Sequence, residues 1–274
     1  MAANFIIPGR STTSFIVALL VVVCSIAGHL PLHSCQENYY DPEWKPAGGT
    51  WYGDPDGDGS DGGACGYGVL STSPYGSSIA AGNSPLFLNG SGCGVCYEVT
   101  CNHTDLCKPT PTDVVITDLC PGGAFCDGSF PHFDLSGTAI SNMAISGQEE
   151  ALRTVAVYDL LYRRIPCSYP GQNISFTVDS GSNPFWLSLI VKYEGGPGDI
   201  QAVQIKQAGN NSAWQAMTQN WGANWMVQSN TGSALQGPLS IRLATQLPGQ
   251  VVVAADVIPA GYDPGATYES SVQF

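Results

Sequence analysis

Aspartates at regular spacing are the first residues of this sequence whose types suggest chemistry. Residues 50–68 read TWYGDPDGDGSDGGACGYG, in which Asp54, Asp56 and Asp58 are followed by Gly59. An EF-hand calcium loop places its first ligands and its turn glycine in this order. The twelfth position, which needs a bidentate glutamate, is Cys65, and neither flank has a helical apolar period. The rim of an active site or a solvated turn is therefore favoured over a calcium site.

Cysteines are the next candidates, as disulfides or as zinc ligands. Cys93 and Cys96 form a C-x-x-C pair, but no second pair has zinc-ribbon spacing, and His103 lies in a glycosylation motif. Disulfides are favoured, and spacing alone leaves their pairing open. The clustered cysteines are Cys65, Cys93, Cys96, Cys101, Cys107, Cys120, Cys126 and Cys167.

The N-terminus predicts secretion, which suits disulfides. Residues 1–27 combine a lone Arg10, an apolar run and a cleavage site with small residues, as in a signal peptide. The apolar run is too short to remain in a membrane as a spanning helix. Cys24 would leave with the signal, and Cys35 would remain as an odd thiol in an extension at 28–46. Four glycosylation motifs agree with secretion. They lie at Asn89, Asn102, Asn173 and Asn210.

The charge of the chain restricts its partners. The formal net charge is −13, and the nine basic residues are scattered apart from Arg163 and Arg164. Nucleic acids and anionic membranes bind basic surfaces, so we expect neither, and charged pectin should be repelled. An uncharged polymer fits this composition better. We expect no cofactor, no metal, no integral membrane association and a monomeric protein.

Composition divides the mature chain into two domains, because the last hundred or so residues contain no cysteine. The first, at 47–169, should be loop-rich, with strands at 95–100 and 113–117 and a helix at 134–144 capped by Asp or Ser. A linker and first-strand region at 170–184 precedes the second, at 185–274. Its strands, which predict an antiparallel β-sandwich, are at 186–193, 200–207, 239–244 and 251–257.

The first of these strands has an alternating pattern that predicts its orientation. Leu187, Leu189 and Val191 should face the core, while Trp186 and Ser188 should face out. A shift by one residue would reverse this assignment.

A set of ordered motifs resembles the plant expansins, and within them the β-expansins, which include the grass pollen group-one allergens. The resemblance covers the chain from about residue 50 onward. In the first domain the motifs are TWYG at 50–53, GACGYG at 63–68, CGVCY at 93–97, ITDLCPGG at 116–123 and HFDLSG at 132–137. In the second they are GSNP at 181–184, VKY at 191–193, WGANW at 221–225 and DVIP at 256–259.

The resemblance implies an all-β fold: a six-stranded double-psi β-barrel, akin to the family-45 endoglucanases, followed by an immunoglobulin-like sandwich that binds polysaccharide. It also implies four disulfides, which would stabilise a chain rich in glycine. These pair Cys65 with Cys93, Cys96 with Cys167, Cys101 with Cys107 and Cys120 with Cys126.

The same resemblance implies a site. Asp134 matches the general acid of the related endoglucanases, so we expect it to be the principal polar contact to a glucan, in one groove with Asp118, Thr50 and Tyr52. The alternatives are a helix cap for Asp134 and a turn aspartate for Asp118.

Aromatic side chains should supply the remaining contacts. Trp51 and Tyr52 in the first domain, with Trp186 and Trp221 in the second, would stack on sugar rings, whereas Trp225 is expected in a core.

The implied activity is non-hydrolytic loosening of plant cell walls, favoured at acidic pH, by a protein secreted to the wall. Expansins lack the catalytic base of their hydrolase relatives, but here Asp54 stands at the offset of that base in TWYGD. A weak inverting glucanase or xylanase using Asp134 with Asp54 or Asp61 is one alternative, and a lectin-like wall-binding protein is another. The residues at 138–143, TAISNM, depart from the usual β-expansin pattern.

Overall fold

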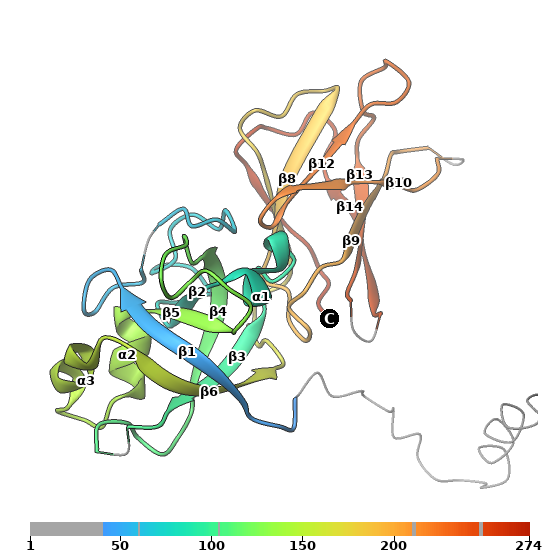
Figure 1. Ribbon diagram of the computed structural model, residues 1–274. Coiled ribbons are helices and arrows are strands. Elements are labelled where there is room, and N and C mark those ends of the chain that lie inside the picture. Colours follow the sequence, from blue (N-terminus) through green and yellow to red (C-terminus); the bar gives the residue numbers. More distant parts are fainter. Residues whose placement is uncertain (1–40, 60, 104, 210–211, 247–248) are drawn as a thin grey trace, which may run out of the picture. The chain divides into compact units, whose positions relative to one another are not determined.

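The computed structural model describes residues 41–59, 61–103, 105–209, 212–246 and 249–274. The predicted signal peptide, Cys24, Cys35 and the glycosylation motif at Asn210 lie outside these residues. Within the described ranges, no helix has both the length and the apolar character needed to cross a membrane. The chain folds into a β-barrel and a pair of β-sheets (Figure 1), which confirms the predicted all-β class.

The first half forms a closed barrel with the strand order β1-β5-β2-β4-β3-β6. The pairs β1–β5 and β2–β4 are parallel, and the other barrel pairs are antiparallel. The elements are β1 (Lys45–Tyr52), β2 (Ile79–Gly82), α1 (Ser84–Phe87), η2 (Leu88–Gly90), β3 (Cys96–Cys101), β4 (Thr112–Leu119), β5 (His132–Ser136), α2 (Gly137–Met143), α3 (Glu149–Val155) and β6 (Tyr158–Ile165).

The helix predicted at 134–144 begins later than expected. β5 continues to Ser136, whose Oγ accepts a hydrogen bond from Ala139 N at 3.1 Å and so caps α2. Asp134 therefore lies inside a strand, two residues before the cap. The alternative in which Asp134 only caps a helix is wrong.

The second half contains a four-stranded sheet, β10-β9-β13-β14, and a five-stranded sheet, β11-β12-β8-β7-β15. All four strands predicted here are confirmed within one or two residues, by β8, β9, β13 and β14. The elements are β7 (Ser175–Val178), β8 (Trp186–Lys192), β9 (Ala202–Lys206), β10 (Gln215–Ala216), β11 (Thr218–Trp221), β12 (Asn224–Gln228), β13 (Leu239–Ala244), β14 (Val251–Ile258) and β15 (Thr267–Glu269).

Strand β8 is buried on more than its core side. The predicted core residues Leu187, Leu189 and Val191 are buried. Ser188 lies on the opposite side but is also fully buried, contrary to the expectation that it faces solvent. Its Oγ donates to Asn224 Oδ1 at 2.6 Å, and its backbone N–H donates to Ser182 Oγ at 3.0 Å. Partners from two other segments thus cover this side of the strand.

The structure contains the four disulfides that the resemblance implies. Two of them, Cys65–Cys93 and Cys96–Cys167, join segments 28 and 71 residues apart, and the other two close short loops.

A backbone hydrogen bond, an ion pair and a close approach of two backbones connect the barrel to the sandwich. Ala223 N, in the turn between β11 and β12, donates to Cys65 O at 3.1 Å. Arg164 of β6 forms an ion pair with Asp199 at 2.9 Å. A Cβ atom on Gly222 would overlap the carbonyl oxygen of Ala64, so the two backbones meet at a distance that only glycine allows.

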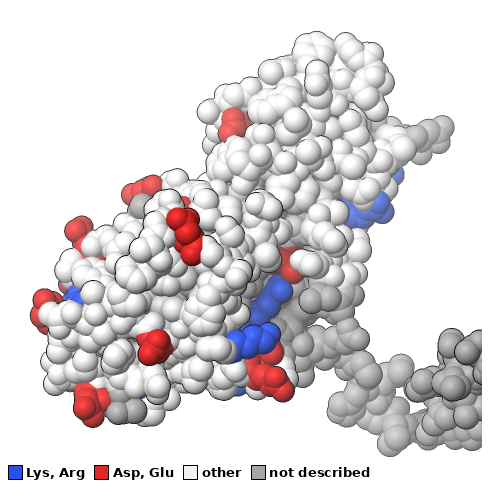
Figure 2. All heavy atoms as spheres, in the orientation of Figure 1, with Lys and Arg blue, Asp and Glu red and all other residues white. Residues whose placement is uncertain are grey.

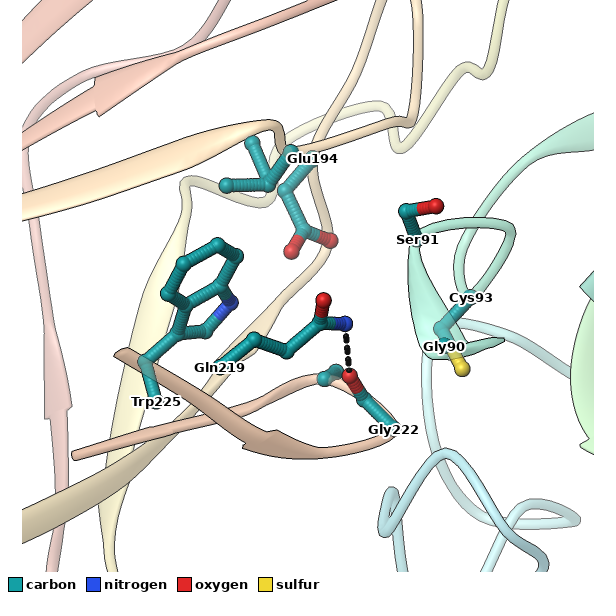
Figure 3. A pocket seen from close by; sticks show the side chains of 9 residues that line it. Gly90, Ser91, Cys93, Glu194, Gln219, Gly222 and Trp225 are labelled. Atoms are coloured by element: carbon teal, nitrogen blue, oxygen red, sulfur yellow. Dashed lines mark hydrogen bonds between the residues drawn. The ribbon is translucent and has the colours of Figure 1, made fainter. Parts of the chain in front are cut away.

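A carboxyl group is buried at this junction. Glu194 lies in a small cavity with Gly90 and Ser91 of the barrel and Trp225 of the sandwich (Figure 3). Gln219, beside it, donates to the carbonyl oxygen of Gly222 at 2.7 Å instead. Glu194 Oε2 has no hydrogen-bond partner among the described residues.

The surroundings of Glu194 disfavour its charged form. Burial raises its pKa to about 8, against weaker opposing effects that include the nearby Lys192 ammonium. The tyrosines Tyr67, Tyr75 and Tyr169 pack nearby, and burial raises their pKa values well above the usual range. Glu194 is therefore neutral at acidic pH.

We predict that Glu194 makes the fold acid-stable. Its pKa is near 4.5 when unfolded and higher when folded, so its contribution is fully present below pH 4.5 and is lost as pH rises toward about 8. The free energy of unfolding should fall by up to about 1.4 kcal/mol per pH unit in this window. In Glu194→Gln, denaturant titrations at several pH values should show a flatter profile.

Glu43→Gln, on the exposed surface, controls for the loss of one acidic side chain. The prediction is contradicted if the profile of Glu194→Gln keeps the wild-type slope between about pH 5 and pH 8.

Candidate functional site

Three polar side chains and one alanine form a row across four neighbouring barrel strands. Thr50 on β1 pairs with Asp134 on β5. Ala81 on β2 pairs with Asp134 on one side and with Asp118 on the other. Because adjacent strands are about 4.8 Å apart, the two aspartates lie about 10 Å apart at their Cα atoms. The small Ala81 leaves room between them. Asp134, Ala81, Asp118 and Tyr52 line an apolar cavity of about 460 Å³, and Thr50 contacts it through Asp134.

A single hydroxyl joins an imidazole to the Asp134 carboxyl group. Thr50 Oγ1 is 2.7 Å from Asp134 Oδ1 and 3.0 Å from His132 Nε2. On β1, Gly48 pairs with His132, and a Cβ atom there would come within 2.7 Å of His132 Nδ1. The absence of a side chain at Gly48 therefore makes the space in which the ring lies.

Burial favours the neutral forms of both His132 and Asp134. Burial lowers the pKa of His132. The pKa of Asp134 is raised, first by burial and also by the nearby Asp118, although the Thr50 hydrogen bond lowers it. A neutral imidazole with its proton on Nε2 donates to Thr50, which then donates to Asp134 Oδ1. When Asp134 is protonated, it can donate a hydrogen bond to a ligand in the cavity.

Asp118 holds the loop that forms one wall of the cavity. Its Oδ1 accepts hydrogen bonds from Ala64 N at 2.5 Å and from Leu119 N at 2.7 Å. A Cβ atom on Gly63 would lie 2.7 Å from the carboxyl carbon of Asp118, so the close approach requires glycine. Asp118 is thus both a lining residue and an anchor.

The aspartate-rich loop is fastened to helix α2 and does not line the cavity. Thr138 N donates to Gly57 O at 3.1 Å, and Arg153 donates to Pro55 O at 2.8 Å. Asp54 O closes a turn with Gly57 N at 2.9 Å, and the Asp54 side chain is exposed. This geometry favours an anchored turn over a catalytic base for Asp54.

Two tryptophans of the sandwich share one face of the five-stranded sheet. Trp221 on β11 pairs with Asn224, which pairs with Ile190 of β8. Alternate residues of a strand share a face, so Trp186 lies on the same face as Ile190 and Trp221. The Trp221 ring also rests on the barrel, because a Cβ atom on Gly66 would be 2.6 Å from it.

The predicted aromatic contacts of the barrel are separated by strand β1. Tyr52 lines the cavity. Trp51 belongs to the other face of the strand, where its indole N–H donates to Arg153 O at 3.2 Å. The structure groups Tyr52 with the polar row and Trp51 with α3, and a sugar contact of Trp51 stays a prediction. Trp225 is buried in the sandwich core, as predicted.

Comparisons with known proteins identify the family. Residues 174–259 match the expansin C-terminal domain, and residues 79–156 match a double-psi barrel family described as lytic transglycolase. Expansin-B11 of Oryza sativa subsp. japonica is 49% identical over 232 residues, which are 84% of this chain and 78% of that protein. Expansin-B3 of Arabidopsis thaliana is 44% identical over 257 residues, 93% and 95% of the two chains. The chain belongs to the β-expansins.

Solved structures agree with this β-expansin at the level of the fold. The crystal structure of an apo expansin from Clavibacter michiganensis superposes with a TM-score of 0.62 and 21% identity, over 84% of this chain and 98% of that one. A mutant of the bacterial protein in complex with cellohexaose matches with the same TM-score and 20% identity.

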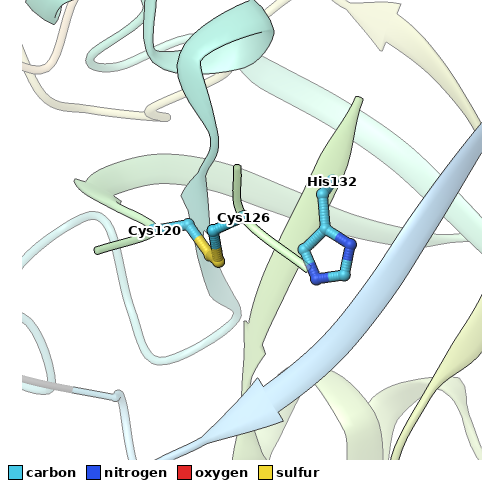
Figure 4. A group of neighbouring side chains, drawn as sticks. All are labelled: Cys120, Cys126 and His132. Carbon is cyan, nitrogen blue, oxygen red and sulfur yellow. A yellow bond between two sulfur atoms is a disulfide. The ribbon is translucent and has the colours of Figure 1, made fainter. Parts of the chain in front are cut away.

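One group of side chains has the arrangement of metal ligands. The ligand atoms of Cys120, Cys126 and His132 lie within 4.8 Å of one another. The two sulfurs are bonded to each other, as Figure 4 shows, and are not thiolates. His132 Nε2 also lies against Thr50. These residues of the β-expansin are therefore a disulfide beside a structural histidine.

The charges in view leave much of the surface of the β-expansin neutral. In Figure 2, acidic side chains are spread singly over the barrel, and the sandwich shows few charges. Of the predicted glycosylation sites that the structure describes, Asn89 and Asn102 are exposed and Asn173 is half-buried.

Sequence reasoning quoted His132 in a motif but gave it no role. The signal was available, because His132, Asp134 and Ser136 alternate with apolar Phe133 and Leu135. This is the period of a strand, and it places the three polar side chains on one face.

We predict that Thr50→Val raises the pKa of Asp134, because the hydroxyl that stabilises the carboxylate is removed. The unpaired acceptor should also cost about 1–3 kcal/mol of stability. NMR titration of the Asp134 carboxyl carbon measures the shift.

Thr138→Val is the matched control, since Thr138 Oγ1 donates to Asp56 O on the anchored loop. An Asp134 titration that is the same in Thr50→Val as in wild type would contradict the assigned hydrogen bond.

Proposed function

We propose that this β-expansin loosens plant cell walls by binding uncharged wall polysaccharides, such as cellulose or xylan, and disrupting their non-covalent contacts without hydrolysis. It would act as a secreted monomer in the wall. The observation that carries the proposal is the half-buried Thr50–Asp134 pair at a cavity whose wall extends toward Trp221. The cellohexaose complex of the bacterial expansin supports a glucan as the ligand class.

The cavity and the sandwich face are connected by one short loop. Ala64 lines the cavity, and Gly66, two residues later, lies under the Trp221 ring. A glycan chain along this path would meet a carboxyl group at Asp134 and a flat aromatic ring at Trp221. Sugar rings have apolar faces and hydroxyl edges, so stacking and hydrogen bonding together hold a neutral chain.

Hydrolysis with inversion needs a second carboxylate that activates water. Asp54 and Asp61 are exposed on the loop outside the cavity lining. Asp118 lines the cavity but accepts two backbone N–H groups. These positions favour binding over bond cleavage, so the glycosidase alternative is not favoured.

Acidic pH favours the proposed contact. The pKa of Asp134 is raised by burial, so a larger fraction of this carboxyl group is protonated at a given acidic pH than for an ordinary aspartate. As pH falls, more molecules can donate a hydrogen bond from Asp134 to a glycan oxygen. A protein that served only as a wall-binding lectin would not need this proton.

We predict that creep of clamped, heat-inactivated wall strips rises as pH falls from about 7 to about 4 with the wild-type protein, through protonation of Asp134. Asp134→Asn has no titrating group there, so its creep should not change with pH. Asp54→Asn is the control and should keep the wild-type profile. A pH-dependent rise in Asp134→Asn equal to that of wild type would contradict the role.

The same proteins test hydrolysis. No new reducing ends should appear from soluble β-glucan or xylan. Sustained release of reducing ends by the wild type that is lost in Asp54→Asn would contradict the non-hydrolytic proposal.

We predict that Trp221→Ala weakens binding to soluble β-glucan about three- to tenfold, since one stacking contact is lost. Trp214→Ala is the matched control, because the Trp214 ring lies under Arg242 on the other sheet. Affinity gel electrophoresis gives both dissociation constants. Equal affinities for the two variants would argue against Trp221 as a sugar contact.

A further inference from the structure

The loop between β4 and β5 exposes two large aromatic side chains. Phe125 is 53% exposed and Phe130 is 58% exposed, which places them among the most exposed large apolar residues that the structure describes. Leu119, at the end of β4, is also exposed. Exposed apolar side chains that gather on one loop beside a cavity are candidates for a binding surface.

This loop is held at both ends, so its phenyl rings are presented by an ordered backbone. The disulfide Cys120–Cys126 closes its first half, and Cys120 N donates to Gly82 O at 2.9 Å. The fully buried Asn83 side chain donates to Phe130 O at 2.8 Å and accepts from His132 N at 3.0 Å. An ordered loop loses little conformational entropy when a ligand binds.

The loop continues the candidate site. Leu119 and Pro121 line the same cavity as Asp134. The Phe125 ring lies 6.1 Å from the His132 ring, with 18° between their planes. Since His132 contacts Thr50, Phe125 is one side chain away from the Thr50–Asp134 pair. Phe125 is therefore connected to the cavity residue Asp134 through the side chains of His132 and Thr50.

We propose that Phe125 and Phe130 form an additional sugar-stacking subsite of the barrel, which binds a further pyranose ring of the same uncharged glycan chain. The inference rests on the proposed function and adds a ligand position beyond Asp134, on the loop closed by Cys120–Cys126.

The chemistry of the loop selects a neutral, flat ligand. Residues 119–131 contain no Lys or Arg, and Asp127 is their one acidic residue. The Asp127 carboxylate accepts a hydrogen bond from Gly123 N at 3.1 Å, within the loop. Phenyl rings bind the apolar face of a sugar, and no cation is present in this segment to bind an acidic polymer. A glycan that already occupies the cavity fits this surface.

The subsite predicts that affinity depends on chain length. A short oligosaccharide can satisfy Asp134 and Trp221 without reaching the loop, whereas a longer one gains the phenyl contacts. In calorimetric titrations with cellotriose and cellohexaose, Phe125→Ala/Phe130→Ala should bind cellohexaose ~10-fold more weakly than wild type, which is about 1.4 kcal/mol. Its affinity for cellotriose should equal that of wild type. Phe125→Trp keeps a flat ring and should bind cellohexaose like wild type.

Val251→Ala removes an apolar side chain that is equally exposed, on β14 of the sandwich, and should leave both affinities unchanged. Melting temperatures check that all variants fold. Wild-type affinity of the double Phe variant for cellohexaose, or an equal loss for both oligosaccharides, overturns the subsite. If Trp221→Ala weakens binding while the double Phe variant does not, the subsite fails and the proposed function stands. If the wild type binds no soluble glucan or xylan, both fail.

Discussion

The register of four barrel strands is the constraint on which the candidate site depends. Parallel pairing of β1 with β5 places Thr50 beside Asp134, and β2 then places Ala81 between Asp134 and Asp118. A shift of one residue in β1 would turn Trp51 toward the groove and move Thr50 to the other face. The glycine at position 48 depends on the same register, because it lies opposite His132. The strand register therefore determines which polar side chains face the cavity.

The junction between barrel and sandwich lies next to this candidate site. It brings Trp221 onto Gly66, two residues from the cavity wall, and it encloses a carboxyl group, Glu194, that is neutral at low pH. Two acids, the half-buried Asp134 and the fully buried Glu194, thus have raised pKa values for the same main reason, which is desolvation. Asp134 lines the cavity of the candidate site, and Glu194 lies between the two halves of the molecule. Acidity favours the neutral form of both.

Local pattern was sufficient for much of the fold and insufficient for the site. The strands of the sandwich could be predicted because their apolar residues alternate, and the core positions of β8 followed. The burial of Ser188 could not be predicted, because its hydrogen-bond partner Asn224 is 36 residues away in the chain. The offset of Asp54 from Thr50 suggested a catalytic base, but the orientation of its loop is set by Arg153, which contacts Pro55 across 98 residues. The position of Phe125 could not be predicted, because an exposed ring has no periodic signal and its stacking on His132 exists only in the folded chain.

Glycine at the junction has a consequence for how such proteins diverge. Gly66 and Gly222 each face backbone or ring atoms from the other half, with no room for a methyl group. Neither half can acquire a side chain there without displacing its neighbour, so the two surfaces must change in concert. In a chimera that keeps this barrel, with its Gly66, a foreign sandwich will dock only if it has a glycine at the position of Gly222. The two domains are therefore exchanged more readily as a pair than singly.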